Sequence, residues 1–329
     1  MNVMVVGGAG YIGSHAVKQL FEAGHSVCVV DNLFRGHLEA IPSEVAFVQA
    51  DVRDCQALQT ALVTHSTDCV MHFAALAYVG ESVGEPLTYY DNNTSGTIQL
   101  IKAMHEVGVR KLVFSSTCAT YGEPEKMPII ESMSQEPINP YGWSKWSVEQ
   151  ILKDYAAANA DFAFCALRYF NVAGAAADGT IGEDHDPETH LIPVILETLL
   201  GKREDITVFG TDYSTPDGTC VRDYIHVEDL VAAHIVAMNS LAPGDQRIYN
   251  LGIGRGYSVR EVLESARRVT GKEIPTIYGN RRPGDPAELY ANAGKIHEEL
   301  GWTALYTEID DIIATAWSWH KNNPDGYGD

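Results

Sequence analysis

The feature that most constrains this chain is a glycine-rich turn near its start, Gly7-Gly8-Ala9-Gly10-Tyr11-Ile12-Gly13. The apolar, β-branched run over Asn2–Val6 predicts a buried strand before the turn, and apolar residues at helical spacing follow it. In such a unit Gly7 permits the tight turn, Gly10 lets a pyrophosphate approach the backbone, and Gly13 lets the helix pack against the strand. The helix N-terminus then offers free N–H groups to the phosphates.

An acidic residue supports a dinucleotide ligand and selects its type. A second apolar run, Ser26–Val30, predicts another strand, and it ends at Asp31. A carboxylate there can accept hydrogen bonds from ribose hydroxyls and would repel a 2′-phosphate, which favours NAD over NADP. A glycine turn alone is weak evidence and can be purely structural. The strand, the helix and the acidic residue around this one favour the ligand.

Strand and helix patterns alternate through the first half of the chain. Further strands are predicted over Val45–Gln49, Cys69–Phe73, Lys111–Ser115 and Phe162–Arg168, with helices over 54–64, 86–106 and 140–158. Repeated β–α units with apolar strands predict an α/β fold, a doubly wound parallel sheet of the Rossmann type. Ligands of such sheets bind beyond the carboxyl ends of the strands.

The second half of the chain has a different character. After Asn171 the sequence becomes rich in turns, and the predicted elements become shorter. We therefore expect a Rossmann domain over residues 1–172 and a smaller α/β substrate domain over 173–329. Residues 221–245 combine a strand with an amphipathic helix, and we expect them to return to the first domain.

The composition limits the partners of the chain. Its 329 residues carry a formal net charge of −21, which disfavours nucleic-acid backbones and anionic membrane surfaces as partners. The six cysteines form no Cys-x-x-Cys pair and predict reduced thiols in a cytoplasmic protein. No basic segment precedes the first strand and no apolar run reaches about 18 residues, so neither a signal peptide nor a membrane span is expected.

A tyrosine and a lysine four residues apart are candidates for proton transfer. Tyr141 and Lys145 lie on one face of the predicted helix after Pro140. An ammonium near a phenol lowers the pKa of the phenol, so that Tyr141 could act as a general base. Alone, this pair is typical of a solvated helix surface. Proton transfer by this pair is favoured because Ser115-Ser116-Thr117 lies at the end of the preceding strand, at the same edge of the sheet.

Several further motifs accompany these residues. They are His72-Phe73-Ala74-Ala75, Val79-Gly80-Glu81-Ser82, Tyr90-Asp91-Asn92-Asn93, Arg168-Tyr169-Phe170-Asn171 and Val221-Arg222-Asp223-Tyr224-Ile225-His226-Val227. Together with the glycine turn and Tyr141–Lys145, the set resembles the extended short-chain dehydrogenase/reductase family, and within it the members that epimerise UDP-hexoses. The resemblance runs from residue 1 to Gly326-Tyr327 and covers nearly the whole chain.

The resemblance implies roles for individual residues. The catalytic ones are Tyr141 as the base, Lys145 and Thr117, which is serine in some relatives. The cofactor contacts are Gly7, Gly10, Tyr11, Ile12, Asp31, Asn32, Asp51, Val52, Phe73, Ala74, Ala75, Asn92, Ser115, Tyr141, Lys145 and Tyr169 or Phe170, of which we select Phe170. The substrate contacts are Thr117, Tyr141, Asn171, His190, Leu191, Thr207, Val208, Phe209, Arg222, Arg282, Asp285 and Leu289.

The resemblance also implies a reaction. With tightly bound NAD, the protein would interconvert UDP-glucose and UDP-galactose through a transient 4-keto sugar, and residues 173–329 would bind the UDP-sugar. Family members commonly pair two long helices per subunit, so we expect a homodimer through 86–106 and 140–158.

Two alternatives to this function remain. A dehydratase on the same scaffold typically carries Asp-Glu after the hydroxyl residue, where this chain has Cys118-Ala119, and a non-catalytic NAD-binding regulator usually lacks the Tyr or the Lys.

The chain departs from the family pattern at three positions. Ala77 replaces a lysine found near the cofactor phosphates of some relatives, and His190 replaces an asparagine. Leu289 replaces a tyrosine beside the 2-position of the sugar, which predicts a roomier pocket.

The acidic stretch Glu183–His190 has spacing that fits no compact ligand set, so we interpret it as a solvated loop and expect no metal.

Overall fold

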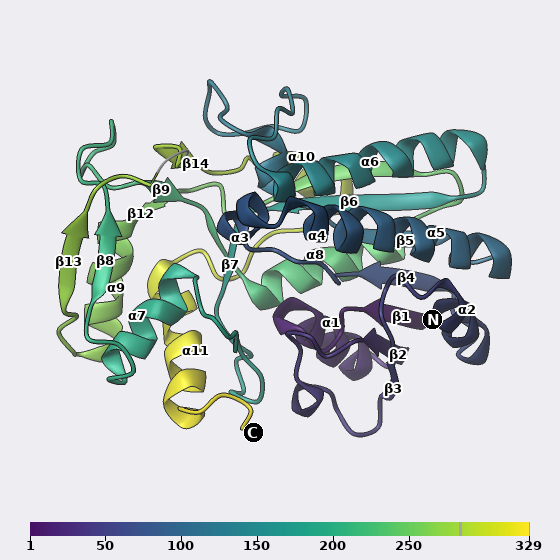
Figure 1. Cartoon of the computed structure of the whole chain (residues 1–329), viewed down its shortest axis with the longest axis horizontal. Coiled ribbons are helices and arrows are strands. Elements are labelled where there is room, and N and C mark those ends of the chain that lie inside the picture. Colours follow the sequence, from purple (N-terminus) through teal and green to yellow (C-terminus); the bar gives the residue numbers. More distant parts are fainter. Residues whose placement is uncertain (283–284, 329) are drawn as a thin grey trace.

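Seven parallel strands form the centre of the computed structural model, which describes residues 1–282 and 285–328 (Figure 1). Their order is β11-β6-β5-β4-β1-β2-β3. The bounds are β1 Asn2–Val6, β2 Ser26–Asp31, β3 Ala46–Gln49, β4 Cys69–His72, β5 Lys111–Ser115, β6 Ala163–Tyr169 and β11 Gln246–Leu251. From β1 the chain adds β2 and β3 on one side and then β4, β5 and β6 on the other. This reversal of strand order between β1 and β4 creates the crevice where such sheets bind ligands. The predicted doubly wound α/β fold is confirmed.

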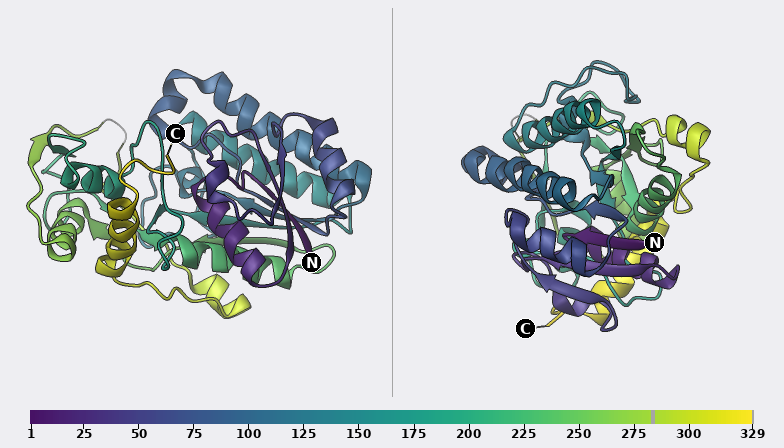
Figure 2. Two further views of the ribbon diagram at one scale, coloured as in Figure 1. Left: turned by 90° about the horizontal axis from the view of Figure 1, so that it is seen from below. Right: turned by 90° about the vertical axis from the view of Figure 1, so that its right-hand side faces the viewer.

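Helices cover both faces of this sheet (Figure 2). On one face lie α1 Tyr11–Glu22 and α8 Val227–Ser240, and on the other lie α2 Cys55–Thr64, α5 Gly96–Val107 and α6 Pro140–Ala158. The alternation of side chains along each strand divides the core between the faces. In β1, Val3 and Val5 pack toward α1 and α8, whereas Met4 and Val6 pack toward the other three helices.

The long helical segment predicted over residues 86–106 is confirmed, but it contains an irregular stretch that the sequence did not predict. The structure has α3 Val79–Gly84, α4 Pro86–Tyr89, a π-helical segment η2 over Tyr90–Ser95 and then α5. The buried side chain of Asn93 explains the irregular turn, because its amide exchanges hydrogen bonds with the Leu76 backbone and donates to Ser144 Oγ at 3.0 Å. Such π segments interrupt helices mostly near functional sites.

The smaller part of the molecule lies beyond the carboxyl ends of the large sheet, on the left in Figure 1. Its strands form three short sheets, made of β7 Asn171–Ala173 with β10 Tyr224–His226, β8 Ile206–Phe209 with β13 Thr276–Gly279, and β9 Val221–Arg222 between β12 Tyr257–Ser258 and β14 Glu288–Leu289. Three helices, α7 Leu191–Leu199, α9 Val259–Thr270 and α11 Ile309–Asn322, share its core. Short segments complete the chain: η1 Leu38–Ala40, η3 Cys118–Tyr121 and α10 Gly294–Leu300.

The segment that returns to the large sheet differs from the predicted 221–245. Its first strand, β9, stays in the smaller part, while α8 packs against α1 as expected. The return continues past residue 245, because β11 pairs in parallel with β6. Gln246, Arg247 and Asn250 interrupt the apolar pattern of β11 and hide it in the sequence.

Two predictions, on the cysteines and on a membrane span, can be compared directly with the structure. All six cysteines lie in the described part of the chain and are free thiols. Among residues 1–282 and 285–328, no helix combines the length and apolarity needed to cross a bilayer.

Candidate active site

Backbone packing requires two of the glycines in the first turn. Gly7 has a φ of +83°, and a Cβ there would overlap the backbone of Ala74 after β4. A Cβ at Gly13 would overlap the carbonyl of Gly7. The turn and the end of β4 are therefore in direct contact, at the point where the strand order reverses.

Gly10 is different, because protein packing alone does not require it. A Cβ at Gly10 would have only the Gly7 carbonyl within 4 Å, at 3.6 Å. Gly10 is the N-cap of α1, which has no side-chain cap and no acidic residue in its first turn. The N–H groups there are thus unclaimed by side chains and free of negative charge, which fits a pyrophosphate. We propose that Ile12, in this first turn, borders the same ligand.

The carboxylate of Asp31 connects the end of β2 to the glycine turn. Its oxygens accept hydrogen bonds from the N–H groups of Ala9 at 3.0 Å and Leu33 at 2.8 Å, and its burial raises its pKa. Two backbone donors leave lone pairs for ribose hydroxyls. Beside it, Asn32 donates to Asp51 Oδ2 at 3.1 Å, which places the next two cofactor candidates side by side.

The other cofactor candidates follow the same edge of the sheet. Val52 is buried against Gly96 of α5, and Asn92 lies in the π segment with its amide donating to Asn93. Phe73, Ala74 and Ala75 follow β4. Tyr11 extends across to the smaller part, where its hydroxyl donates to the carbonyl of Gly174 at 2.6 Å.

Tyr141 and Thr117 meet at the end of β5. Tyr141 is the second residue of α6, whose N-cap Asn139 accepts a hydrogen bond from the Gly142 N–H. Thr117 caps η3 and accepts from the Ala119 N–H at 3.1 Å, and its side chain lies near enough to Tyr141 to oppose the rise in the pKa of that phenol. A phenol and an aliphatic hydroxyl so placed could bind and deprotonate one substrate hydroxyl.

Lys145 is not among the larger influences on the pKa of Tyr141 in this structure. Burial raises the pKa of Tyr141 well above its ordinary range, Tyr169 adds to the rise, and only the nearby Thr117 opposes them among the larger influences. Lys145 instead donates to the carbonyl of Ser115 at 2.9 Å. Its own burial lowers its pKa to about 7, so it carries less charge at neutral pH than a surface lysine.

The substrate candidates form three groups. Leu289 packs with Cys118 and Phe170 around Tyr121, which places it next to the loop that carries Thr117. Asn171, at the start of β7, follows Phe170 and donates its N–H to the Asp223 carbonyl at 3.1 Å. This first group adjoins the loop that carries Thr117.

The second group lies on the short strands of the smaller part. Arg222 forms an ion pair with Asp285, and the Arg282 guanidinium lies over the ring of Phe209 at 4.0 Å. Val208 is buried in the core, whereas Thr207 and Phe209 lie on the opposite, partly exposed face of β8. Pro283 and Gly284, within the turn expected to complete this group, lie outside the described residues.

The third group consists of His190, the N-cap of α7, and Leu191, its first residue. His190 Nδ1 lies 2.7 Å from Glu183 Oε1, and the segment before it is not the solvated loop expected from the sequence. Glu183 and Glu188 are 4% and 8% exposed. Burial alone would lower the pKa of His185, but these two carboxylates raise it to about 9.

Comparison with known proteins identifies the family. A model of the NAD dependent epimerase/dehydratase family matches residues 3–252. The chain belongs to this family. NAD is therefore its cofactor, as the glycine turn and Asp31 predict.

The most similar relatives agree over the full length of the chain. A UDP-glucose 4-epimerase of Lacticaseibacillus casei is 51% identical over 330 residues, which cover 100% of this chain and 99% of the relative. A crystal structure of a UDP-glucose 4-epimerase is 48% identical with a TM-score of 0.96 and 100% coverage of both chains. The UDP-glucose 4-epimerase of Bifidobacterium longum, in complex with NAD⁺ and UDP, is 40% identical with a TM-score of 0.95, covering 99% of this chain and 100% of its own.

In this member of the family, sequence reasoning missed a buried network beneath the catalytic residues. Arg168 donates to Glu149 at 2.9 Å and to the Tyr121 hydroxyl at 2.7 Å. Ser116 donates to the same Glu149 at 2.6 Å, so the loop carrying Thr117 is tied to α6. The signal was present, since Arg168 is a charged residue within an apolar strand and requires a buried partner.

The choice between Tyr169 and Phe170 also needed the structure. The Tyr169 hydroxyl contacts Ser115 Oγ beside the catalytic residues, whereas Phe170 packs into the cluster around Tyr121. Adjacent residues at a strand end point to opposite sides, and the sequence alone did not say which side the site occupies.

Proposed function

We propose that this protein interconverts UDP-glucose and UDP-galactose by inverting carbon 4 of the hexose. The observation that carries the proposal is the position of Tyr141 at the start of α6 and of Thr117 just after β5, at the carboxyl edge of a dinucleotide-binding sheet. Two full-length relatives at 48–51% identity are named UDP-glucose 4-epimerase, which supports the choice of reaction.

The chain's own residues supply binding and proton transfer. Thr117 accepts and orients the 4-hydroxyl of the sugar, and Tyr141 takes its proton and later returns it. NAD, held by the glycine turn and Asp31, would supply the hydride chemistry at carbon 4, and the positive charge of its oxidised form would favour the Tyr141 phenolate. Lys145, which is 3% exposed and fixed by Ser115, adds further positive charge when protonated.

Inversion requires that the sugar turn over while its nucleotide stays in place. We assign the nucleotide to the smaller part, where Arg222, Arg282 and Phe209 present two guanidinium groups and an aromatic ring. Asp285 holds the Arg222 guanidinium in one orientation, which suits a phosphate that takes two hydrogen bonds. The residues assigned to the hexose, Leu289 and Asn171, offer fewer charged contacts.

The experiment that tests the proposal uses purified protein, UDP-galactose and no added NAD. The expected product is UDP-glucose of unchanged mass, and denatured protein should release close to one equivalent of nicotinamide nucleotide. A product lighter by one water would indicate the dehydratase. An absence of turnover in protein that retains the nucleotide would indicate the non-catalytic regulator.

We also propose that the protein is a cytoplasmic homodimer paired through α5 and α6. These helices lie side by side (Figure 1). A surface cavity of about 310 Å³ between them is lined by Ile98, Ile101, Ile151 and Tyr155, together with Lys102, His105 and Glu106. Ile151→Asp should shift the mass measured by light scattering from dimer to monomer. Ile277→Asp, at a half-exposed position on β13, is the matched control.

A further inference from the structure

Four potential metal ligands converge in the segment between β7 and α7. They are Glu183, His185, Glu188 and His190, in the pattern Glu-x-His-x-x-Glu-x-His. One ligand atom from each lies within 4.8 Å of the others. In the sequence, the spacing of these residues argues against a metal. In the structure, the loop turns back on itself and brings the four side chains together.

Three of the four short distances between these side chains match the edges of a tetrahedral zinc site, and they involve both carboxylate oxygens of Glu188. His185 Nδ1 lies 3.3 Å from Glu183 Oε1 and 3.6 Å from Glu188 Oε2. His190 Nδ1 lies 3.3 Å from Glu188 Oε1 and 2.7 Å from Glu183 Oε1. With zinc–ligand bonds of about 2.0–2.2 Å, the edges of a tetrahedral site measure about 3.3–3.6 Å.

Unpaired buried atoms provide an independent indication of a ligand. Glu183 Oε1 and His185 Nδ1 are buried and have no hydrogen-bond partner among the described residues. The short approach of His190 to Glu183 therefore lacks hydrogen-bond geometry. Glu183 Oε1 and His185 Nδ1 face each other at 3.3 Å without hydrogen-bond geometry, and such a buried pair is favourable only where the imidazole is charged or a third group bridges the two atoms.

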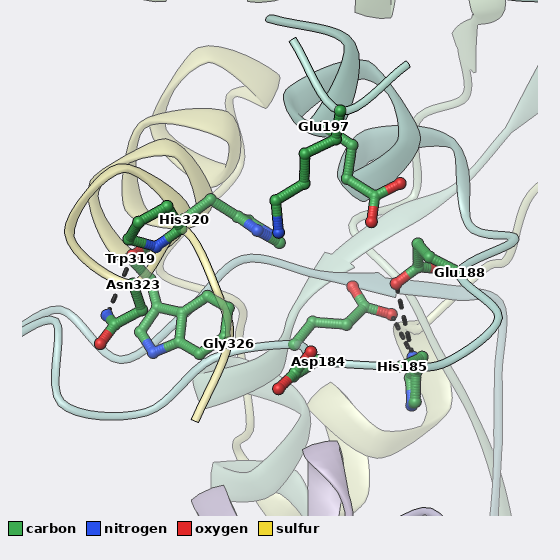
Figure 3. Close-up of a pocket in the computed structure, with 11 residues that line it drawn as sticks. Asp184, His185, Glu188, Glu197, Trp319, His320, Asn323 and Gly326 are labelled. Carbon is green, nitrogen blue, oxygen red and sulfur yellow. Dashed lines mark hydrogen bonds and ion pairs between the residues drawn. The ribbon is translucent and has the colours of Figure 1, made fainter. Parts of the chain in front are cut away.

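The surroundings hold the ligands in place and leave little room. Glu188 Oε1 accepts the N–H groups of Thr189 at 2.6 Å and His190 at 2.7 Å, which fixes its carboxylate. The edges of Tyr11 and Tyr78 pack against the His185 ring. Figure 3 shows His185 and Glu188 at one end of a pocket that extends toward Trp319 and His320. This pocket has a volume of about 20 Å³ and adjoins Glu183, His185 and Glu188 but not His190.

We propose that Glu183, His185, Glu188 and His190 bind one zinc ion. Two imidazoles with two carboxylates suit zinc, whereas magnesium and calcium prefer oxygen ligands throughout. Four protein ligands close the coordination sphere, so the site is structural. It fixes the start of α7, with His190 and Leu191, against Tyr11 and Tyr78 of the NAD-binding part. The alternative is a metal-free cluster of charged histidines and glutamates.

The test measures metal binding rather than epimerisation, so its outcome does not depend on the proposed function. Untagged protein is dialysed against a chelator and titrated with Zn²⁺ in a calorimeter, and bound metal is counted by elemental mass spectrometry. We expect one equivalent of zinc and a melting temperature several degrees higher with zinc. Co²⁺ in its place should give the intense visible absorption of tetrahedral cobalt.

Variants separate this site from adventitious binding. Glu183→Gln and His190→Gln should each lower zinc affinity at least about tenfold. Asp186→Asn, an exposed neighbour in the same loop, should retain it. His190 is 45% exposed, so its variant should fold even where Glu183→Gln does not. Less than a tenth of an equivalent in the wild type, or equal zinc binding by all three variants, would overturn the proposal.

Discussion

The cofactor side of the site lies at the ends of the strands of the large sheet, which are four to seven residues long. The substrate side lies on strands of two to four residues and on their loops. On the cofactor side, Gly7 and Gly13 are positioned by backbone contact. On the substrate side, the candidates are held by polar pairs such as Arg222 with Asp285. Packing fixes the first side, and polar contacts between distant segments fix the second.

Tyr141 lies where the two sides meet, and its loss should have the largest effect. Tyr141→Phe preserves the ring and removes the proton-transferring oxygen, so turnover of UDP-galactose should fall about 10²–10⁴-fold while bound NAD is retained. Tyr278→Phe, at an exposed position on β13, is the control. Near-normal turnover by purified Tyr141→Phe would rule out this residue as the base.

The network beneath the catalytic loop should carry the next largest effect, on stability. Arg168→Met leaves the carboxylate of Glu149 buried without its cation, and the free energy of unfolding should fall by about 3–5 kcal/mol. Denaturant unfolding measures this loss. Arg110→Met, which removes an ion pair with the exposed Asp161, should cost less than about 1 kcal/mol. Similar losses in the two variants would contradict the importance of the buried network.

The glycine turn allows packing and ligand binding to be separated. Gly7→Ala forces a side chain into a positive φ and against Ala74, and should lower the free energy of unfolding by about 2–4 kcal/mol. Gly10→Ala should fold normally and lose NAD affinity. Gly24→Ala shares the positive φ of Gly7 but has open space around it, and controls for backbone strain alone. If Gly10→Ala kept full NAD affinity, the pyrophosphate would not lie against this turn.

Substitution of Leu289, on the substrate side, should have the smallest effect, which is a change in substrate preference. Leucine is smaller than tyrosine and has no hydroxyl, so the pocket should admit an N-acetyl group at the 2-position of the sugar, with turnover below that of UDP-galactose. In Leu289→Tyr, the ratio of UDP-N-acetylglucosamine to UDP-galactose turnover should fall at least about tenfold, because packed walls resist compression. An unchanged ratio, or no N-acetyl turnover in the wild type, would show that Leu289 does not control access.

The sequence by itself determined the Rossmann sheet, the glycine turn, Asp31 and the preference for NAD. These follow from local patterns: the period of apolar residues, and a turn whose geometry only glycine permits. The substrate assignments came from resemblance, because Arg222 and Asp285 are far apart in the chain and no local pattern joins them.

Tertiary structure alone decided which polar groups meet. It directed Lys145 to the Ser115 carbonyl, joined Arg168 to Glu149, and closed the loop from Glu183 to His190 around one point. It also added β11 to the sheet despite its polar residues. Side-chain pairing depends on where distant backbone segments pack, and burial then decides the pKa of each group. Neither the pairing of side chains nor their pKa values can be read from the sequence, because both depend on how the core packs.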